Sequence, residues 1–356
     1  MSLKINNFYN KYFSNLAINL AKINKYITSE NPSVGCVVVD FQNKILSTDY
    51  TSEKGRPHAE FNALNKLKSK VKKKIFVSLE PCNHYGKTPP CTHLICKKNV
   101  KEVHCSNIDM NPFVKGKGIN FLKQSKILTA VHSLHKDIFY RKYSYAMMKK
   151  IPHVSAKLAL TKNLSTVFQN KKYFTNSKSL KFAHLLRYKN DSILIGKKTL
   201  NKDLPKLNCR LRGLEKFSPR IFLINSNLSF QKKQLLMYPK NTVVFHASSD
   251  LNKISKLKKY FLLEKIKENH GILSATEMLK KIYNYNCRRL LIEGGLETIK
   301  YFHKHMCINK FYLVKSNLQS KNTKNLASNF VKLLSGNNLD KYKVKINLDN
   351  NYLFKI

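Results

Sequence analysis

The feature that most constrains this chain is a pair of short segments, PHAE at residues 57–60 and EPCNHYGKTPPC at residues 80–91. Together they hold one imidazole, His58, and two thiols, Cys82 and Cys91. Nitrogen and sulfur donors of these types are the ligands that zinc prefers in proteins. A fold that uses all three must bring the two segments together around one metal ion, so we predict a zinc site where they meet.

The local sequence around each donor is typical of a catalytic rather than a structural zinc site. A catalytic site has three protein ligands and a fourth position open to water, and a zinc deaminase also needs a carboxylate that moves protons without binding the metal. Glu60 follows His58 at the expected start of a helix and supplies that carboxylate. Cys91 also opens an expected helix, where the helix dipole favours its thiolate form.

Less specific interpretations of the same residues remain open. A single His-x-Glu pattern often marks only the start of a surface helix, and intracellular cysteines are commonly buried thiols. A closed structural site is a third interpretation, with His84, His93 or Cys96 as the fourth ligand. Cys96 lies five positions after Cys91 on the expected helix, where it points to a different face. The full set of residues favours the catalytic interpretation.

The apolar pattern alternates between short β-branched runs and helical stripes, and it does so in two blocks. Such alternation indicates an α/β fold with a largely parallel sheet, and 356 residues are enough for two domains. We place the boundary near Lys150–Pro152 and predict domains at 1–150 and 151–356. Strands are expected at 34–40, 74–79, 100–106, 153–161, 191–196, 219–226, 241–248 and 288–295, and helices at 8–25, 58–70, 91–99, 118–127, 179–190 and 275–286.

Composition limits the classes of function. The formal net charge is +46, from 66 Lys and Arg against 20 Asp and Glu, which raises the alternative of nucleic-acid binding. The lysines are spread over the whole chain, however, so we favour a compositional bias that also attracts phosphorylated metabolites. No apolar run reaches the roughly 18 residues of a membrane span, and the N-terminus lacks a secretory signal. With eight scattered cysteines, we expect a cytoplasmic protein without disulfides or a membrane partner.

The N-terminal block resembles a known family of enzymes. The segments that carry the resemblance are NPSVGCVVV (31–39), KGRPHAEFNAL (54–64), VSLEPCNHYGKTPPCTHLI (77–95) and DMNPFVKGKGI (109–119). They are similar to the deaminase domain of the bifunctional riboflavin-biosynthesis deaminase/reductase family, which has a cytidine-deaminase-like fold with three layers. Nucleoside and tRNA deaminases usually carry Cys-x-x-Cys, whereas eight residues separate the two cysteines here. The long spacer is the part of the motif that is typical of the riboflavin family.

The resemblance implies the chemistry of the first site. His58, Cys82 and Cys91 would bind one zinc ion per chain, and Glu60 would be the catalytic proton donor. The implied reaction is hydrolytic deamination of a diaminopyrimidinone that carries a ribosylamino phosphate, with release of ammonia. Several polar side chains on expected loops are suited to a base edge and a phosphate: Asn31, His84, Lys87, Thr88 and Asp109.

The C-terminal block is similar to the reductase domain of the same family, which has a dihydrofolate-reductase-like α/β fold. The similarity rests on LLRYKNDSILIGKKTL (185–200), DLPKLNCR (203–210) and IEGG (292–295). The last segment is a Gly-Gly turn between an expected strand and helix, where backbone N–H groups are suited to a cofactor phosphate. The resemblance implies NADPH as cofactor, with contacts from Ala159, Tyr173, Thr199, Asp203, Gly294 and Gly295. It implies substrate contacts from Lys171, Arg187, Leu207, Arg210 and Glu293.

Several positions of the C-terminal block depart from the family pattern. The usual Ser-Leu-Asp-Gly is replaced by Thr161, Lys162, Asn163 and Leu164, and the second Asp of Asp-Asp-Pro by Leu204. Loss of a glycine where backbone approaches a ligand can close or reshape a pocket. A deaminase with a degenerate reductase domain is therefore an alternative to the bifunctional enzyme, and a tRNA deaminase or a non-enzymatic zinc module are more remote alternatives. For the bifunctional enzyme, the resemblance implies a homodimer that acts on phosphorylated pyrimidines and not on nucleic acid.

Overall fold

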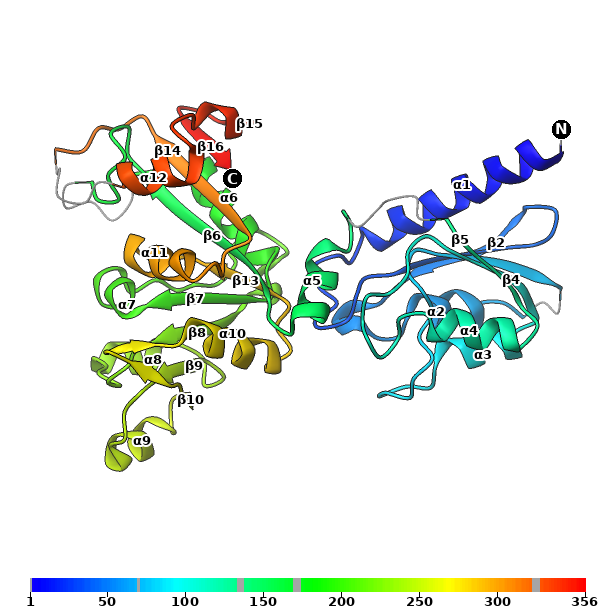
Figure 1. The fold of residues 1–356 in the computed structure, drawn as a ribbon, viewed down its shortest axis with the longest axis horizontal. Coiled ribbons are helices and arrows are strands. Elements are labelled where there is room, and N and C mark those ends of the chain that lie inside the picture. Colours follow the sequence, from blue (N-terminus) through cyan, green and yellow to red (C-terminus); the bar gives the residue numbers. More distant parts are fainter. Residues whose placement is uncertain (1, 69–70, 133–137, 169–173, 322–326) are drawn as a thin grey trace. The chain divides into compact units, whose positions relative to one another are not determined.

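The computed structural model describes residues 2–68, 71–132, 138–168, 174–321 and 327–356. It divides into two compact units, Met1–Lys150 and Ile151–Ile356, and each is described by itself (Figure 1). No helix in the described ranges is both long and apolar enough to cross a membrane. Lys171 and Tyr173, two of the residues expected in the reductase site, lie outside the described ranges.

Unit 1, residues 1–150, is built on a mixed five-stranded sheet with the order β2-β1-β3-β4-β5. Strand β1 runs antiparallel to β2 and β3, while β3, β4 and β5 are parallel. The expectation of a largely parallel sheet is wrong for this block, because a short turn at residues 40–44 joins β1 to β2 and short connections give antiparallel pairs. The strands are β1 Gly35–Val39, β2 Ile45–Tyr50, β3 Lys73–Val77, β4 Val100–Cys105 and β5 Leu128–Val131.

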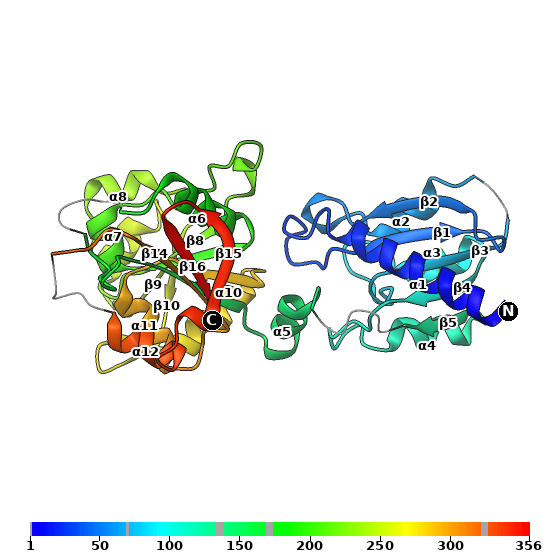
Figure 2. The same cartoon turned by 90° about the horizontal axis from the view of Figure 1, so that it is seen from above.

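Side chains alternate across this sheet and create two apolar faces. Helix α1 (Ser2–Ala21) runs across β1, β3 and β4 on one face, where Phe13 packs against Val37 and Phe76 (Figure 2). On the opposite face, the intervening side chains, such as Val38, pack against three further helices. The unit therefore has the three layers predicted for it (Figure 1). The helices of the second face are α2 Ala59–Asn65, α3 Cys91–Lys97 and α4 Lys117–Gln124, and α5 Arg141–Lys149 ends the unit.

Unit 2, residues 151–356, contains a nine-stranded sheet with the order β10-β9-β8-β7-β13-β6-β14-β16-β15. All neighbouring pairs from β10 to β14 are parallel, as the alternating sequence predicts, and β16 and β15 at one edge are antiparallel. Strands β11 and β12 form a separate hairpin. The strands are β6 His153–Leu160, β7 Ser192–Gly196, β8 Arg220–Ile224, β9 Val243–His246, β10 Leu262–Lys265, β11 Glu268–Asn269, β12 Ile272–Leu273, β13 Arg289–Ile292, β14 Lys310–Ser316, β15 Lys343–Leu348 and β16 Asn351–Lys355.

Helices cover both faces of this sheet, so its central strands are buried on both sides. In β7, Leu194 packs in one core with α10 and α11, while Ile193 and Ile195 pack in a second core with α6, α7 and α9. Because β6, β7, β8 and β13 are parallel neighbours in the sheet, their carboxyl ends meet at one edge, which is where α/β folds bind ligands. The helices are α6 Ser177–Tyr188, α7 Lys197–Asp203, α8 Lys232–Met237, α9 Leu251–Leu257, α10 Ala275–Asn284, α11 Leu296–Lys304 and α12 Ser328–Ser335.

Candidate active sites

Three donors converge at the expected metal site in unit 1. His58 is the N-cap residue of α2, Cys82 follows β3 by a short segment, and Cys91 is the first residue of α3. The Nδ1 atom of His58 lies 3.6 Å from Sγ of Cys82 and 3.4 Å from Sγ of Cys91. A tetrahedral zinc ion with ordinary bond lengths separates an imidazole nitrogen from a thiolate sulfur by about 3.6 Å. The donor set and its spacing therefore fit zinc.

The two thiols differ in acidity. The backbone N–H of Cys91 donates to Sγ of Cys82 at 3.4 Å. The pKa of Cys82 is lowered to about 4, chiefly by the hydrogen bond from the Cys91 thiol and also by His58, against the effect of burial. The pKa of Cys91 is raised by the same thiol contact and by burial. The backbone N–H at the α3 terminus therefore serves the Cys82 sulfur, and the expectation that this terminus favours the Cys91 thiolate stays a prediction.

Glu60 lies in the first turn of α2 and is 3% exposed. Burial raises the pKa of its carboxyl to about 6, although the neighbouring His58 charge acts in the opposite direction. A carboxyl with a pKa near neutrality both accepts and donates protons readily. Among the described residues, the converging donors are His58, Cys82 and Cys91, so the fourth ligand of a closed structural site is missing there.

A carboxylate that the sequence analysis missed fixes the position of the cysteine loop. Glu80 directly precedes Pro81 and Cys82, and it accepts hydrogen bonds from the backbone N–H groups of Gly116 at 2.9 Å and Ile119 at 3.3 Å. These groups belong to the start of α4, so the strand that leads to Cys82 is tied to a helix terminus. The sequence contains an indication of this contact, because a Glu that follows a buried strand and lies next to a ligand needs hydrogen-bond partners for its charge.

The loop between the two cysteines is open to solvent. His84, Lys87 and Thr88 are exposed there, as expected for residues that meet a substrate. The guanidinium of Arg56, just ahead of the His58 segment, donates to Oγ1 of Thr88 at 2.8 Å and joins the two parts of the metal motif.

Two other polar residues have structural partners. Asp109 is 4% exposed, and its carboxylate accepts from the backbone N–H of Asn111 at 2.8 Å and the hydroxyl of Tyr143 at 3.3 Å. Asp109 therefore lies in a buried loop segment with protein partners, and its contact with a substrate stays a prediction. The amide of Asn31 donates to the Gly55 carbonyl at 3.0 Å and holds the loop that leads to His58.

Unit 2 contains a cleft of about 1500 Å³ at the carboxyl ends of its central strands. Every reductase residue expected from the sequence and described by the structure lines it: Ala159, Arg187, Thr199, Asp203, Leu207, Arg210, Glu293, Gly294 and Gly295. These residues come from segments that are far apart in the sequence, and the parallel sheet brings them together.

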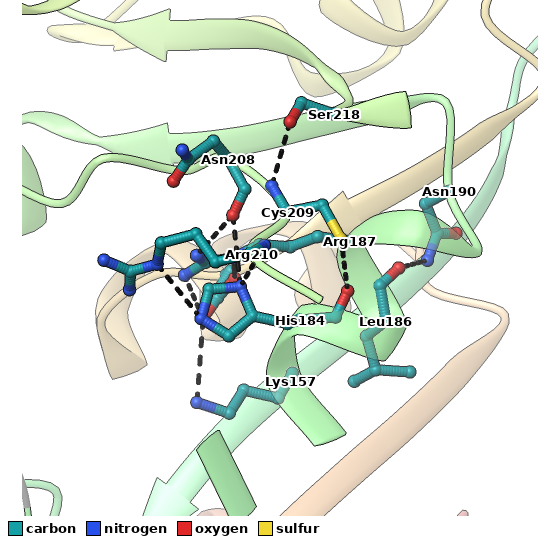
Figure 3. Close-up of polar contacts among 10 residues, drawn as sticks. Lys157, His184, Leu186, Arg187, Asn190, Asn208, Cys209, Arg210 and Ser218 are labelled. Carbon is teal, nitrogen blue, oxygen red and sulfur yellow. Dashed lines mark hydrogen bonds and ion pairs between the residues drawn. The ribbon is translucent and has the colours of Figure 1, made fainter. Parts of the chain in front are cut away.

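A buried ion pair between Arg187 and Glu293 belongs to this lining, and Figure 3 shows Arg187 with its neighbours Asn208 and Lys157. Arg187 donates from Nε to one oxygen of Glu293 at 2.8 Å, from Nη2 to the other oxygen at 3.0 Å, and from Nη1 to the Asn208 carbonyl at 3.0 Å. Lys157, to which the sequence analysis gave no role, lies 3.7 Å from Glu293. Burial raises the pKa of Glu293, but the charges of Arg187 and Lys157 outweigh burial and hold this pKa below its ordinary value. The carboxylate is therefore ionised at neutral pH.

The Gly-Gly turn after β13 packs against threonines. The backbone N–H of Gly295 donates to Oγ1 of Thr199 at 2.8 Å, and the expected contact of this turn with a cofactor phosphate stays a prediction. A Cβ atom on Gly196 would lie 2.4 Å from Oγ1 of Thr298. Glycine at this position lets α11 approach the end of β7 closely, so that residues of both elements line the cleft.

The departures from the family pattern after β6 do not close the cleft. The segment that begins at Thr161 folds into a turn in which Oγ1 of Thr161 accepts from the Ser165 N–H at 2.9 Å. Asn163 donates to the Ser320 carbonyl at 2.9 Å. Leu164 takes a positive φ of 61°, the conformation that a glycine adopts without strain. Thr166, Val167 and Phe168 still line the cleft.

Comparison with known proteins agrees with both sites. A family model for the cytidine and deoxycytidylate deaminase zinc-binding region matches residues 9–107, and one for the RibD C-terminal domain matches residues 164–316. A riboflavin biosynthesis protein RibD from Aquifex aeolicus is 33% identical over 305 residues, which cover 83% of this chain and 83% of the relative. This chain belongs to the RibD family. A RibD structure from Acinetobacter baumannii has the same fold, with a TM-score of 0.85 and 24% identity over 98% of each chain.

Membership of the RibD family assigns the chain to riboflavin biosynthesis, with a deaminase and a reductase activity in one polypeptide. It confirms the predicted fold class and both cofactors, zinc for the deaminase and NADPH for the reductase. A shorter relative, the diaminohydroxyphosphoribosylamino-pyrimidine deaminase of Buchnera aphidicola subsp. Schizaphis graminum, is 38% identical over 142 residues. The match covers 40% of this chain and 95% of that relative.

Proposed function

We propose that unit 1 hydrolyses the exocyclic amine of 2,5-diamino-6-(5-phosphoribosylamino)pyrimidin-4-one. The products are ammonia and 5-amino-6-(5-phosphoribosylamino)uracil. We propose that unit 2 then reduces the ribosyl group of that product to a ribityl group. The names of related proteins support these substrates, since a Thermotoga maritima structure with a TM-score of 0.77 is described as a deaminase and reductase of these compounds.

In the deaminase site, His58, Cys82 and Cys91 hold the zinc ion, which supplies Lewis-acid activation when bound. Glu60 accepts a proton from the attacking water and then, protonated, delivers it to the pyrimidine ring or to the leaving amine. Its pKa of about 6 suits both steps at neutral pH. Glu80 holds the Cys82 segment in place, and the exposed loop between the cysteines is the surface on which the substrate phosphate is read.

In the reductase site, NADPH supplies the hydride when bound. Arg187 orients Glu293 and the loop that carries Asn208, while Arg210 faces the substrate anion. The net reduction also takes up one proton, and Lys157 and Glu293 form an ion pair within the cleft where this reaction would take place. Residues on the far side of the cleft, around Thr199 and Gly295, would hold the cofactor.

The observation that carries the deaminase proposal is the tetrahedral spacing of three donors beside a buried carboxyl that is not among them. Glu60→Gln should keep one zinc ion per chain and lose ammonia release by at least about a thousandfold, because general acid–base catalysis is removed while the ligands survive. The matched control is Glu53→Gln, an exposed carboxylate on the preceding turn, which should retain both zinc and turnover. Full turnover by Glu60→Gln would refute the assigned role.

The reductase proposal is tested by supplying the deaminated product and NADPH to the whole protein and following nicotinamide absorbance. We expect one NADPH to be oxidised per molecule of product. A flat trace beside an active deaminase would support the alternative of a degenerate reductase domain.

We also propose that the protein works as a homodimer in the cytoplasm, as the family resemblance implies. Light scattering after size-exclusion chromatography should give twice the chain mass of 41.3 kDa. A mass equal to one chain at micromolar concentration would refute the dimer.

A further inference from the structure

His184, which the sequence analysis did not single out, connects two segments of the reductase cleft. It lies on α6 one turn before Arg187 and lines the cleft (Figure 3). Its Nδ1 atom is 3.2 Å from the Asn208 carbonyl, and its Nε2 atom is 3.3 Å from Nε of Arg210. The imidazole therefore contacts both ends of the short loop from residue 208 to residue 210.

The chemistry of these partners selects one form of the His184 ring. The Asn208 carbonyl only accepts a hydrogen bond, so Nδ1 carries the proton, and Nε of Arg210 only donates, so Nε2 has the free lone pair. The backbone N–H of Arg210 also lies 3.2 Å from Nδ1, a contact that the other tautomer would satisfy. In that tautomer Nε2 would carry a hydrogen that points at the N–H of Arg210 Nε, and the same clash would arise in the protonated ring.

Arg210 differs from Arg187 in what remains available to a ligand. Nε, Nη1 and Nη2 of Arg187 all donate to protein oxygens. Arg210 is exposed in the cleft, and no carboxylate among the described residues forms an ion pair with it. His184 contacts only Nε of this guanidinium, which leaves its two Nη groups for a ligand in the cleft, and an arginine can bind a phosphate at two points.

The charged groups around His184 come from its own helix and from three other parts of the unit. Arg187 lies on the same helix, Arg210 on the loop, Glu293 at the end of β13, and Lys157 on β6 beside Glu293. Burial lowers the pKa of His184, and the charges of Arg187 and Arg210 lower it further, against smaller opposite effects of the Asn208 carbonyl and Glu293. The ring is therefore neutral at neutral pH, which is the form that its two contacts require.

We propose that neutral His184 is a positioning residue that orients Arg210 toward the phosphate group of the reductase substrate. This rests on the proposed reductase function. The contact acts on recognition of the phosphate and not on hydride transfer, so losing it should raise the KM for the phosphorylated substrate and leave kcat unchanged.

Steady-state kinetics between pH 5 and pH 8 test this with two variants. His184→Gln keeps an acceptor and cannot become charged, and His184→Phe fills the space without an acceptor. We expect the KM of the wild type to rise about tenfold at the acid end, the KM of His184→Gln to lack that extra rise, and the KM of His184→Phe to be about tenfold high throughout. The second ionisation of the substrate phosphate affects all variants equally. His303→Gln, which removes an imidazole of α11 that packs against Phe311 and Phe330, should match the wild type.

A second measurement does not depend on turnover. The Nε–H resonance of Arg210, assigned by its loss in Arg210→Lys, should shift with pH together with the His184 ring, with a midpoint below 6.5, and should not shift in His184→Gln. An Arg210 resonance whose chemical shift does not change with pH would overturn the proposal, and so would equal KM values for the wild type and His184→Phe. A wild type that fails to oxidise NADPH would refute the reductase function instead, while the resonance would still decide whether His184 holds Arg210.

Discussion

The Oε1 atom of Glu80 accepts a hydrogen bond from the backbone N–H of Gly118 at 3.0 Å, across 38 positions of the sequence. The contact joins the residue that leads into the cysteine loop to the first turn of α4. Negative charge at a helix N-terminus is favourable, so the carboxylate and the helix stabilise each other. The metal ligand Cys82 therefore has its position fixed by a residue that does not itself bind metal.

Replacing Glu80 by Gln should weaken zinc binding without removing a ligand. The amide keeps one acceptor but points N–H hydrogens at backbone donors, which costs roughly 2 kcal/mol of local stability. Outer partners of metal ligands typically contribute a factor of about 10–100 in metal affinity. Competition with a chromophoric chelator measures the zinc Kd, and Glu80→Asp, which keeps the charge with a shorter reach, should fall between Gln and the wild type. Unchanged affinity in Glu80→Gln would show that the cysteine loop holds its shape alone.

Replacing Gly118 by Ala should disturb the same contact from the other side. A Cβ atom there would lie 2.0 Å from the carbonyl oxygen of Pro81, so backbone must move. Overpacking of this kind costs about 1–3 kcal/mol, and we expect the zinc Kd to rise about tenfold. The matched control is Gly86→Ala in the cysteine loop, where the nearest atom to a new Cβ is 3.6 Å away. Equal zinc affinity in the two variants would contradict the argument.

The sequence predicts most of the buried strands of both units and the edge strands poorly, and it also misses β14, which lies inside the sheet of unit 2 and is mostly buried. Runs such as GCVVV in β1 and SILIG in β7 are buried throughout and β-branched, so their pattern is strong. Strand β15, Lys343–Leu348, was not predicted because it is an edge strand with mostly exposed side chains and its apolar alternation is weak. Strand β2 was also missed, because it is an edge strand whose side chains are nearly all half-buried and show no alternation.

The sequence predicts the three converging donors because each one directly follows a proline, in two short motifs on either side of β3. It does not predict His184, Lys157 or Glu80, because the partners of these residues are distant in the sequence and only the fold brings them together. For Asp109, polarity in a loop-like segment suggested exposure, whereas the structure buries it against Tyr143.

Replacing Asp109 by Asn should change how stability depends on pH. Burial raises the pKa of the Asp109 carboxyl to about 7, whereas an unfolded aspartate ionises near pH 4. Between roughly pH 4 and pH 7 the folded state keeps a proton that the unfolded state loses, so this group makes unit 1 less stable as pH rises through that window.

The amide introduced by Asp109→Asn has no such titration, and the variant should exceed the wild type in stability above pH 7, by up to roughly 4 kcal/mol, and match it near pH 4. Hydrogen exchange of peptides around Asp109 and Tyr143 in the zinc-loaded protein reports this locally. A wild type and variant with parallel pH profiles would show that the carboxyl is not protonated in the folded state.

Two ion pairs of unit 2 provide a test of what burial does to a charge pair. Lys178 and Asp349 lie 2.6 Å apart with side chains 43% and 49% exposed, whereas Arg187 and Glu293 lie 2.8 Å apart with side chains 10% and 14% exposed. The exposed pair has the shorter distance, so distance alone predicts that it contributes more to the free energy of unfolding. Solvent screening predicts the reverse, because breaking a buried pair leaves a charge without a partner.

We therefore expect Glu293→Gln to lower the free energy of unfolding of unit 2 by roughly 3 kcal/mol and Asp349→Asn to lower it by less than about 1 kcal/mol. Because the chain has two units, urea unfolding should be followed by hydrogen exchange of β13 and β16, which report on unit 2 alone. Added salt should reduce the small effect of Asp349→Asn further and leave that of Glu293→Gln nearly unchanged, since buried charges are screened little. Equal losses in the two variants would mean that Glu293 remains solvated in the cleft and that Arg187 is available to a substrate after all.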